Sequence, residues 1–431
     1  MTRVLVLGAG VSGLAAARLA RRSGMQVVIY DENPGTRAID EGFGIATGQW
    51  DASLLAGVEL VIASPGFSER SLPIVESIEA GVAVLGEVEF AWRHLSSPVI
   101  AVTGTNGKTT VTEATAAMLD ASGMDAPATG NIGAPLSDFT DRSHDVLVVE
   151  VSSFQLRFTE DFHPGIAAIT NVASDHLDWH GSDHSYRSAK ALIYANQTAD
   201  DILVYDSDDR GAAEVASSAP SRLIPVSGRS LPSGGAGVDH GRLVVEDLSI
   251  DTDELASDDP THLVNLAMAA SMALQAGATK AGVTEAAIEY RPGAHRRTLV
   301  AVSEGVRWVN DSKATNPHAA LASIGAQDQV ILIAGGRAKD LDLAPLAKEP
   351  NVRMTIGIGE SGPELVEAAG EKGRLAGTLD IAVEMAAQAA VAGDTVLLAP
   401  GCASFDQFES YRARGDRFTE LVKERVGGVV K

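Results

Sequence analysis

The sequence predicts an α/β protein built from three domains in series. Three observations support this fold class. The chain has 431 residues, which is more than one hydrophobic core usually serves. Short apolar runs alternate with helical patterns, as is typical of parallel sheets. This alternation restarts twice, and we place the domains at residues 1–93, 94–292 and 293–431.

The first domain is expected to be Rossmann-like. Apolar runs predict strands, and a helical pattern lies between the last two of them; the strands are 4–7, 27–30, 60–63 and 82–85, and the helix is 73–80. A glycine loop, Gly8-Ala9-Gly10-Val11-Ser12-Gly13, follows the first strand, and Asp31 ends the second. Such a loop lets the backbone approach a pyrophosphate at a helix N-terminus, and the acid can accept a ribose hydroxyl. The loop predicts a bound nucleotide or nucleotide sugar, with a structural tight turn as the alternative.

The second domain is expected to be a phosphate-loop domain. Its strands are predicted at 99–102, 146–151 and 166–169, and a helix begins at Lys108. The loop before that helix offers backbone N–H groups to phosphates, Lys108 a cation, and Thr109 a hydroxyl for Mg²⁺. The predicted ATP-binding residues are Gly104, Thr105, Asn106, Gly107, Lys108, Thr109 and Thr110. Val102 stands where the common phosphate loop has its first glycine.

Polar residues follow two strands of this second domain. Glu150 lies in the strand predicted at 146–151, and the polar segment 170–178, which contains His176, follows the strand at 166–169. Ligands bind at the carboxyl ends of parallel strands, and triphosphates need Mg²⁺ held by nearby side chains. Alone, each residue would more often be a helix cap or a solvated side chain. Together, after a phosphate loop, they predict a metal site.

The rest of the chain returns to the α/β pattern after one irregular segment. Residues 228–260 are rich in Gly, Ser and Asp, which predicts hairpins or an irregular excursion rather than core. An alanine-rich helix is expected at 261–275, and Arg291-Pro292-Gly293 marks the last boundary. The third domain is expected to be Rossmann-like, with strands at 308–310, 330–334, 354–357 and 395–398 and helices at 362–370, 381–391 and from about Phe408.

Composition excludes several classes of protein. The formal net charge of -23 opposes binding of nucleic acid. The single cysteine, Cys402, rules out an intramolecular disulfide and fits a reducing compartment. The first apolar run is too short for a signal peptide, and no later stretch reaches the roughly 18 apolar residues of a membrane span. We expect a cytoplasmic monomer without membrane insertion.

The phosphate loop without its first glycine resembles that of the Mur ligase and folylpolyglutamate synthetase superfamily. Five segments in order resemble the D-glutamate-adding branch of the Mur ligases: Ser64-Pro65-Gly66, Gly130-Asn131-Ile132-Gly133, Glu150 to Leu156, Asn310 to Asn316, and Cys402 to Phe408. The resemblance covers essentially the whole chain. It implies an ATP-dependent amide ligase whose substrates are UDP-N-acetylmuramoyl-L-alanine, D-glutamate and ATP. The implied reaction forms an acyl phosphate, which the D-glutamate amine then attacks.

The resemblance also implies roles for particular residues. UDP-sugar binding falls to Gly10, Val11, Ser12, Gly13, Asp31, Ser64, Pro65 and Gly66, with Asn131 and Gln155 toward the muramoyl-alanine arm. ATP is also met by Asn265, Arg296 and Asp311, and D-glutamate by Lys313, Thr315, Lys339, Ser404 and Tyr411. The catalytic residues are Lys108, His176 and Lys190, and Lys190 is expected to carry a carbamate derived from CO₂. Two Mg²⁺ ions would be held by Thr109, Glu150, His176 and the Lys190 carbamate.

Two departures and three alternatives accompany this prediction. His262 stands where relatives have the first asparagine of the adenine-side helix, and Arg337 stands where many relatives carry aspartate. The nearest alternative is a sibling ligase that adds another amino acid or extends folate with glutamate. A nicotinamide oxidoreductase would use the Gly8 to Gly13 loop but has no use for Lys108. The third alternative is a nucleotide-binding regulator that has lost catalysis.

Overall fold

The computed structural model describes residues 1–33, 41–338 and 341–426, and of Asp178 only the backbone. The described chain contains three separate sheets, flanked by helices, so the predicted α/β class with three domains is confirmed. By its internal contacts the chain divides into two compact units. The first contains residues 1–172 and 179–290, and the second contains residues 173–178 and the chain from Arg291 onward.

The first sheet is parallel and has the strand order of a doubly wound fold. Its order is β3 (Gly44–Thr47), β2 (Gln26–Asp31), β1 (Arg3–Leu7), β4 (Leu60–Ala63), β5 (Ala83–Gly86). The helices of this region are α1 (Val11–Arg22), α2 (Leu72–Glu79) and α3 (Glu87–Trp92). Strand β3 was not predicted, because its residues are partly or fully exposed and form no apolar run.

The central sheet carries the phosphate loop on an inner strand. Its order is β14 (Leu248–Asp251), β13 (Arg242–Val245), β12 (Ala236–Asp239), β11 (Arg222–Val226), β10 (Ile202–Asp206), β9 (Ile166–Ile169), β6 (Val99–Thr103), β8 (Leu147–Glu150), β7 (Ala128–Gly130). The strands from β7 to β12 run parallel, so the loops after β6, β8 and β9 meet at one edge.

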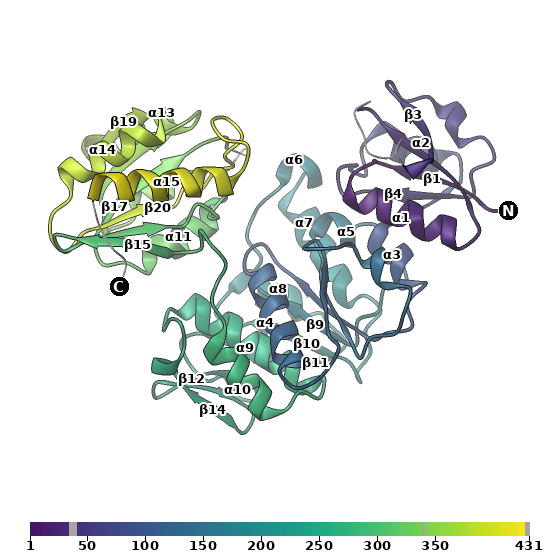
Figure 1. Cartoon of the computed structure of the whole chain (residues 1–431), viewed down its shortest axis with the longest axis horizontal. Helices are drawn as coiled ribbons and strands as arrows, with labels where there is room; N and C mark the ends of the chain where they lie inside the picture. The colour runs from purple at the N-terminus through teal and green to yellow at the C-terminus, as the bar shows by residue number, and fades with distance from the viewer. Residues whose placement is uncertain (34–40, 339–340, 427–431) are drawn as a thin grey trace. The chain divides into compact units, whose positions relative to one another are not determined.

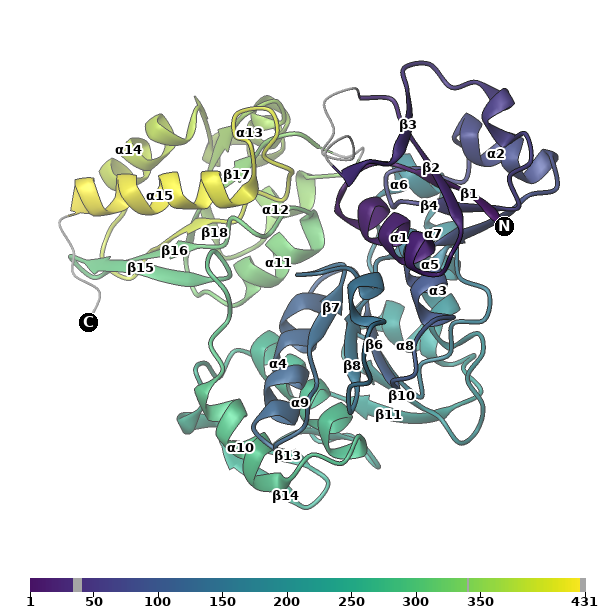
Figure 2. The same cartoon turned by 45° about the vertical axis from the view of Figure 1, so that its right-hand side comes forward.

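Helices cover both faces of the central sheet. Figure 2 shows α4 (Lys108–Asp120) and α9 (Pro260–Gln275) side by side, and α10 (Lys280–Glu289) packs against both. The other helices are α5 (Ser153–Leu156), α6 (Leu177–His180), α7 (Asp183–Ala191) and α8 (Arg210–Ala216). One hydrophobic cluster joins β1, α1 and α3 to β6, β9 and α7, which explains why the first two sheets belong to one unit.

The segment 228–260 forms hairpins, as predicted, but the expectation that it lies outside the core is wrong. Strands β12, β13 and β14 extend the central sheet in antiparallel order. Leu243, Val245, Leu248 and Ile250 are buried in the same cluster as α9. Alternate residues of β13 and β14 are buried, as expected for strands with one face on the core. The sequence did not predict this because each strand has only four residues and is surrounded by glycine, serine and aspartate.

The third sheet has helices on both faces. Its order is β15 (Thr298–Ser303), β16 (Val306–Asn310), β20 (Thr395–Leu398), β17 (Val330–Gly335), β18 (Val352–Ile358), β19 (Gly373–Gly377), and only the β15–β16 pair is antiparallel. Figure 1 shows α14 (Leu379–Ala389) beside α15 (Tyr411–Val426) on one face. Helices α11 (Pro317–Gly325), α12 (Ala344–Lys348) and α13 (Gly362–Ala369) pack on the other.

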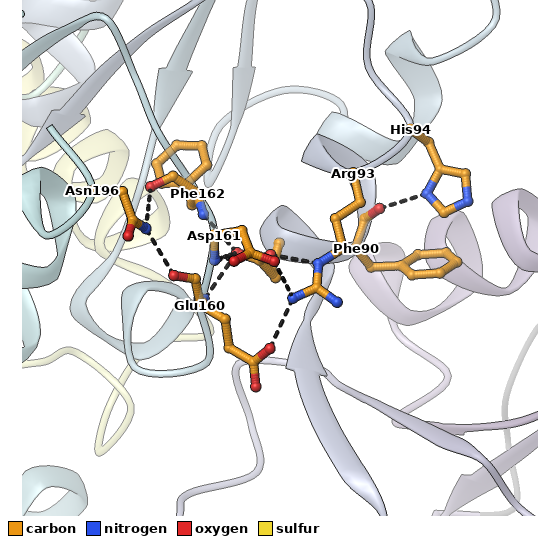
Figure 3. A network of polar contacts seen from close by, with 8 residues as sticks. Phe90, Arg93, His94, Glu160, Asp161, Phe162 and Asn196 are labelled. Carbon is orange, nitrogen blue, oxygen red and sulfur yellow. Dashed lines mark hydrogen bonds and ion pairs between the residues drawn. The ribbon is translucent and has the colours of Figure 1, made fainter.

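Helix α3 is fixed by two buried carboxylates on its inner side. Glu89 is fully buried and accepts hydrogen bonds from Arg93 Nε at 2.7 Å and from the backbone N–H groups of residues 160–162. Figure 3 shows this network, in which Asn196 holds the same loop through the carbonyls of Glu160 and Phe162. The loop at residues 160–162 therefore satisfies its backbone N–H groups with the Glu89 carboxylate of α3 instead of with backbone carbonyls.

Glu87, the other buried acid of α3, predicts a pH dependence of stability. One of its oxygens accepts the Ser137 N–H at 2.7 Å, and burial raises the pKa of Glu87 from 4.5 to about 7 against the opposing effect of that hydrogen bond. Between these pH values the folded state binds more protons than the unfolded state. The contribution of Glu87 to the free energy of unfolding is therefore fully present below pH 4.5 and is lost as the pH rises through about 7. We expect Glu87→Gln to raise the thermal unfolding midpoint at about pH 8 and much less at about pH 5.

The matched control for this prediction is Glu79→Gln, which changes an exposed acid at the end of α2. It should leave the pH dependence of the midpoint unchanged. Equal shifts of the Glu87→Gln midpoint at both pH values would contradict the explanation.

Candidate active site

The phosphate loop lies between β6 and α4 and is held by residues that follow β9. Asn171 accepts the Thr105 N–H with its backbone oxygen and the Asn106 N–H with its side-chain oxygen, both at 2.8 Å. The Thr170 hydroxyl donates to the Asn106 carbonyl at 2.5 Å. A Cβ at Gly104, where φ is 147°, would lie 1.8 Å from the Thr170 hydroxyl oxygen. Only glycine fits there, so the loop is shaped before any ligand binds.

Lys108 is the first residue of α4, and its ammonium group turns back over the loop. Its Nζ donates to the carbonyls of Gly104 at 2.9 Å and Thr105 at 3.1 Å. The cation therefore lies beside the backbone N–H groups that the sequence assigned to the phosphates. A helix N-terminus and a lysine at the same place form an anion-binding site.

Three predicted residues meet at the ends of β7 and β8. The Thr109 hydroxyl donates to one oxygen of Glu150 at 2.7 Å, and the Asn131 amide donates to the other at 2.8 Å. The described residues contain no group of three His, Cys, Asp or Glu side chains placed to hold a metal. A hydroxyl and one carboxylate next to a phosphate site nevertheless fit Mg²⁺, which takes few protein ligands and completes its shell with phosphates and water.

Lys190 is buried, and Tyr186 joins it to the phosphate loop. The Lys190 ammonium lies 4.5 Å from the centre of the Tyr186 ring. The Tyr186 hydroxyl lies 2.9 Å from the Thr105 hydroxyl oxygen. Tyr186 was not among the predicted site residues, although its position four residues before Lys190 on α7 was a usable signal.

Asn265 lies against the phosphate loop from α9. A Cβ at Gly107 would be 2.9 Å from the Asn265 side-chain oxygen. His262, one turn earlier, is buried and stacks on Tyr290 with ring centres 6.4 Å apart. The predicted Asn265 is thus next to the phosphate loop. At the position where relatives have the first asparagine, this chain has the buried His262 ring packed on Tyr290.

The glycine loop of the first sheet is braced by its acid. Asp31 accepts the Ala9 N–H at 2.7 Å and the Asn33 N–H at 2.9 Å. A Cβ at Gly13 would lie 1.9 Å from the Gly8 carbonyl oxygen and 2.8 Å from the Ser64 hydroxyl, so helix α1 approaches the first strand as closely as glycine allows. Asp31, the glycine loop and Ser64 are thereby brought together.

A cavity of about 710 Å³ opens beside Asp31 and Gly66. Its other lining residues are Glu32, Gly48, Gln49, Trp50, Phe67, Ser71, Leu72 and Pro73. The rings of Trp50 and Phe67 suit a flat base, but neither was predicted, because no local pattern separates them from core aromatics. Gln155, predicted for the same ligand, uses its side-chain oxygen to cap α5 by accepting from Ser152.

The second unit brings together most of the residues predicted for D-glutamate. The Lys313 ammonium lies 4.2 Å from the centre of the Tyr411 ring, and Thr315 N–H donates to the Lys313 carbonyl. Ser404 is buried, and its carbonyl accepts from the backbone N–H groups of Gln407 and Phe408. Lys339 lies outside the described residues.

Arg414 ties these segments together and was missed by the sequence analysis. It is 1% exposed and donates to the Ser312 hydroxyl at 2.9 Å, the Ser312 carbonyl at 2.9 Å and the Cys402 carbonyl at 3.2 Å. Burial lowers the pKa of Arg414 to about 10, so the guanidinium stays charged at neutral pH. In the sequence it is indistinguishable from a surface arginine of a helix.

Asp311, Arg296 and His176 also belong to the second unit. Asp311 accepts the Arg297 N–H at 3.3 Å; burial raises the pKa of Asp311, and the positive charges of Arg297 and Arg296 oppose this. His176 has a left-handed backbone, with φ of 53°, and its N–H donates to the Asp175 carboxylate at 2.9 Å. Asp175 in turn accepts from the Asn316 amide at 3.1 Å.

The fold and these sites define the class of protein as an α/β protein with a phosphate-type loop on its central sheet and a separate cavity on a doubly wound sheet. Three family models match it: "Mur ligase MurD-like, N-terminal domain" at residues 2–86, "Mur ligase middle domain" at 102–233 and "Mur ligase, glutamate ligase domain" at 295–402. None of the helices in the described ranges has the length and apolar character needed to cross a bilayer.

Curated relatives match over nearly the full length. The chain is 40% identical to UDP-N-acetylmuramoylalanine--D-glutamate ligase of Frankia casuarinae, covering 98% of this chain and 94% of the relative. It is 38% identical to the protein of that name from Acidobacterium capsulatum, with coverage of 97% and 96%. The chain therefore belongs to the Mur ligase family.

Solved structures share the fold at low identity. A pseudomurein peptide ligase type C from Methanothermus fervidus superimposes with a TM-score of 0.62 at 17% identity, covering 98% of this chain and 100% of that one. MurF ligase from Thermotoga maritima in complex with ADP gives 0.61 at 18% identity, covering 93% and 95%.

Proposed function

We propose that this protein is the ATP-dependent ligase that joins D-glutamate to UDP-N-acetylmuramoyl-L-alanine in peptidoglycan precursor synthesis. The observation that carries the proposal is the full-length similarity, at 35–40% identity, to enzymes named for that reaction. The phosphate loop accounts for ATP, and the cavity beside Asp31 accounts for a second nucleotide. The cytoplasm is favoured as its place of action, because ATP is a co-substrate and because the single cysteine, Cys402, has no disulfide partner in the chain and fits a reducing compartment.

The phosphate loop would hold the triphosphate of ATP. The N-terminus of α4 and the Lys108 ammonium would meet the negative charge that grows on the transferred phosphoryl group, because Asn171 already accepts the N–H groups of Thr105 and Asn106. The L-alanyl carboxylate attacks the γ-phosphorus to form an acyl phosphate and ADP. The D-glutamate amine then attacks the acyl carbon, and phosphate leaves.

Mg²⁺ would be held by Thr109 and Glu150, which already share a hydrogen bond of 2.7 Å. The ion supplies charge neutralisation for the phosphates when it is bound. Asn131 fixes the second oxygen of Glu150, so that this carboxylate keeps one orientation. His176 remains a proposed participant from the second unit.

Lys190 would carry a carbamate. Its side-chain nitrogen is buried, and burial in general disfavours a charged ammonium relative to the neutral amine that reacts with CO₂. We expect a carbon-13 signal from labelled bicarbonate in the wild-type protein that is missing from Lys190→Arg. A signal of equal size in both proteins would contradict this assignment.

D-Glutamate would be bound in the second unit by Lys313, Thr315, Ser404 and Tyr411. A dicarboxylate needs charge-assisted donors at both ends, and a lysine with neighbouring hydroxyls supplies them. The Arg414 guanidinium donates to Ser312 and Cys402. Its role would therefore be to position the two segments that contain Lys313 and Ser404, and not to bind the substrate.

The test is phosphate release with ATP, Mg²⁺ and UDP-N-acetylmuramoyl-L-alanine, with a panel of amino acids supplied one at a time. D-Glutamate is expected to exceed L-glutamate, glycine and meso-diaminopimelate by at least about a hundredfold, because a site built around polar donors rejects ligands that leave them unpaired. Equal or greater turnover with meso-diaminopimelate would assign the protein to a sibling reaction.

A further inference from the structure

The end of helix α6 lies within the first unit between the nucleotide cavity and the phosphate loop. Trp179 packs against the hydrophobic cluster of the first sheet that contains Leu7, Tyr30 and Phe158. Its carbonyl accepts a hydrogen bond from Arg70 Nη2 at 2.9 Å. The guanidinium of Arg70 also covers Gly181, where a Cβ would lie 3.1 Å from Nη1.

Arg70 belongs to the segment that forms one wall of the cavity. Gly66, Phe67 and Ser71 line the cavity directly, and Arg70 lies between them in the chain. The neighbouring Glu69 forms an ion pair with Arg157 at the end of α5. A ligand that orders the segment 66–71 would therefore also order Arg70 and Glu69, whose side chains contact α6 and the end of α5.

His180, the next residue after Trp179, packs against residues of α5 and α7. It is 4% exposed, and its Nε2 lies 2.9 Å from the Ser153 hydroxyl oxygen. Its ring stacks on Phe154 and meets Tyr186 edge to face, with ring centres 5.5 Å and 5.2 Å apart. A bonded nitrogen and two packed rings leave the imidazole one orientation.

Tyr186 links His180 to the phosphate loop. Its hydroxyl meets Thr105, and its ring lies under the Lys190 ammonium. The series Arg70, Trp179, His180, Tyr186 and Thr105 is thus continuous, with each step a hydrogen bond, a ring contact or a peptide bond.

We infer that His180 is a positioning residue that couples the two nucleotide sites of the first unit. An occupant of the cavity fixes segment 66–71 and, through Arg70, the backbone of Trp179. His180 then holds Tyr186 in the orientation that braces Thr105. Nucleotide sugar and ATP should consequently strengthen each other's binding, and equally so, because coupling between binding equilibria is reciprocal. This inference rests on the proposed function for the identity of the two ligands.

The test measures binding of a non-hydrolysable ATP analogue with Mg²⁺ by calorimetry, with and without saturating UDP-N-acetylmuramoyl-L-alanine. In the wild-type protein the nucleotide sugar should tighten binding of the analogue by at least about fivefold. Arg70→Ala, which removes an exposed side chain, and His180→Ala should each reduce this factor to less than about twofold while both ligands still bind. His180→Phe keeps the ring contacts but loses the Ser153 hydrogen bond, so its factor should be intermediate.

Two variants serve as matched controls. Arg142→Ala removes an exposed arginine that pairs with Asp125, and His163→Ala removes a histidine that bonds Asp201. Both should keep the wild-type factor. The inference is overturned if Arg70→Ala and His180→Ala keep it as well, if the controls lose it, or if the wild-type protein shows none. It is also overturned if His180→Ala weakens both ligands alike with the factor unchanged, as a purely structural role predicts. Failure of the wild-type protein to bind the nucleotide sugar at all would instead reject the proposed function.

Discussion

Lys108→Ala is expected to reduce phosphate release by about a thousandfold or more while binding of UDP-N-acetylmuramoyl-L-alanine survives. The ammonium is the charged group of the phosphate loop, and in the structure it lies over the loop carbonyls of Gly104 and Thr105. Its removal leaves the helix N-terminus and backbone N–H groups to meet the triphosphate alone. The cavity beside Asp31 is built from other residues of the first sheet, so its ligand should be unaffected.

Two measurements on each protein check this result: the initial rate of phosphate release and calorimetric binding of the nucleotide sugar. Lys423→Ala, an exposed lysine in the last turn of α15, is the matched control and should behave as wild type. Joint loss of turnover and nucleotide-sugar binding in Lys108→Ala would argue against separate nucleotide sites.

Glu150→Gln should lower the rate by about a hundredfold and raise the Mg²⁺ concentration needed for half-maximal rate. The carboxylate accepts from Thr109 on one oxygen and from Asn131 on the other. A glutamine has one side-chain oxygen, which can accept from Asn131 while its amide nitrogen donates to the Thr109 hydroxyl; the negative charge and one of the two acceptor oxygens are then lost. A titration of Mg²⁺ against initial rate measures both effects.

Glu113→Gln is the control for this substitution, because Glu113 is exposed on the same helix as Thr109. A Glu150→Gln protein with unchanged Mg²⁺ dependence and a rate within about twofold of wild type would remove Glu150 from the proposed metal site.

Features that depend on neighbours in sequence could be predicted. The glycine loops, Lys108, Thr109 and the strand-end acid Glu150 follow from a strand, a turn and a helix read in order. The buried strands of the three sheets are apolar runs, and most lie where the runs predicted. The resemblance to a family then added residues, such as Lys313 and Tyr411, that no local pattern would select.

Features that depend on tertiary packing could not be predicted in this way. The Arg414 guanidinium acts through four hydrogen bonds, to Ser312, 102 residues away, and to Cys402, 12 residues away. Tyr186 reaches Thr105 of the phosphate loop from helix α7. Trp50 and Phe67 line the cavity because strand order brings the ends of β3 and β4 to the same edge as Asp31. Nothing in their sequence neighbourhood distinguishes these side chains from ordinary core or surface residues.

The buried Glu89 of α3 bears on how this chain can be recombined with its relatives. A fragment beginning at residue 94 would keep the loop at 160–162 but lose the acceptor of its three backbone N–H groups, and a first domain ending at residue 93 would carry a carboxylate with no loop to bind. A chimaera with a foreign first domain is therefore better joined ahead of α3, so that the acid and its loop come from one parent. The junction that best preserves these hydrogen bonds therefore lies before Glu87, ahead of the domain boundary that the sequence pattern predicts at residue 93.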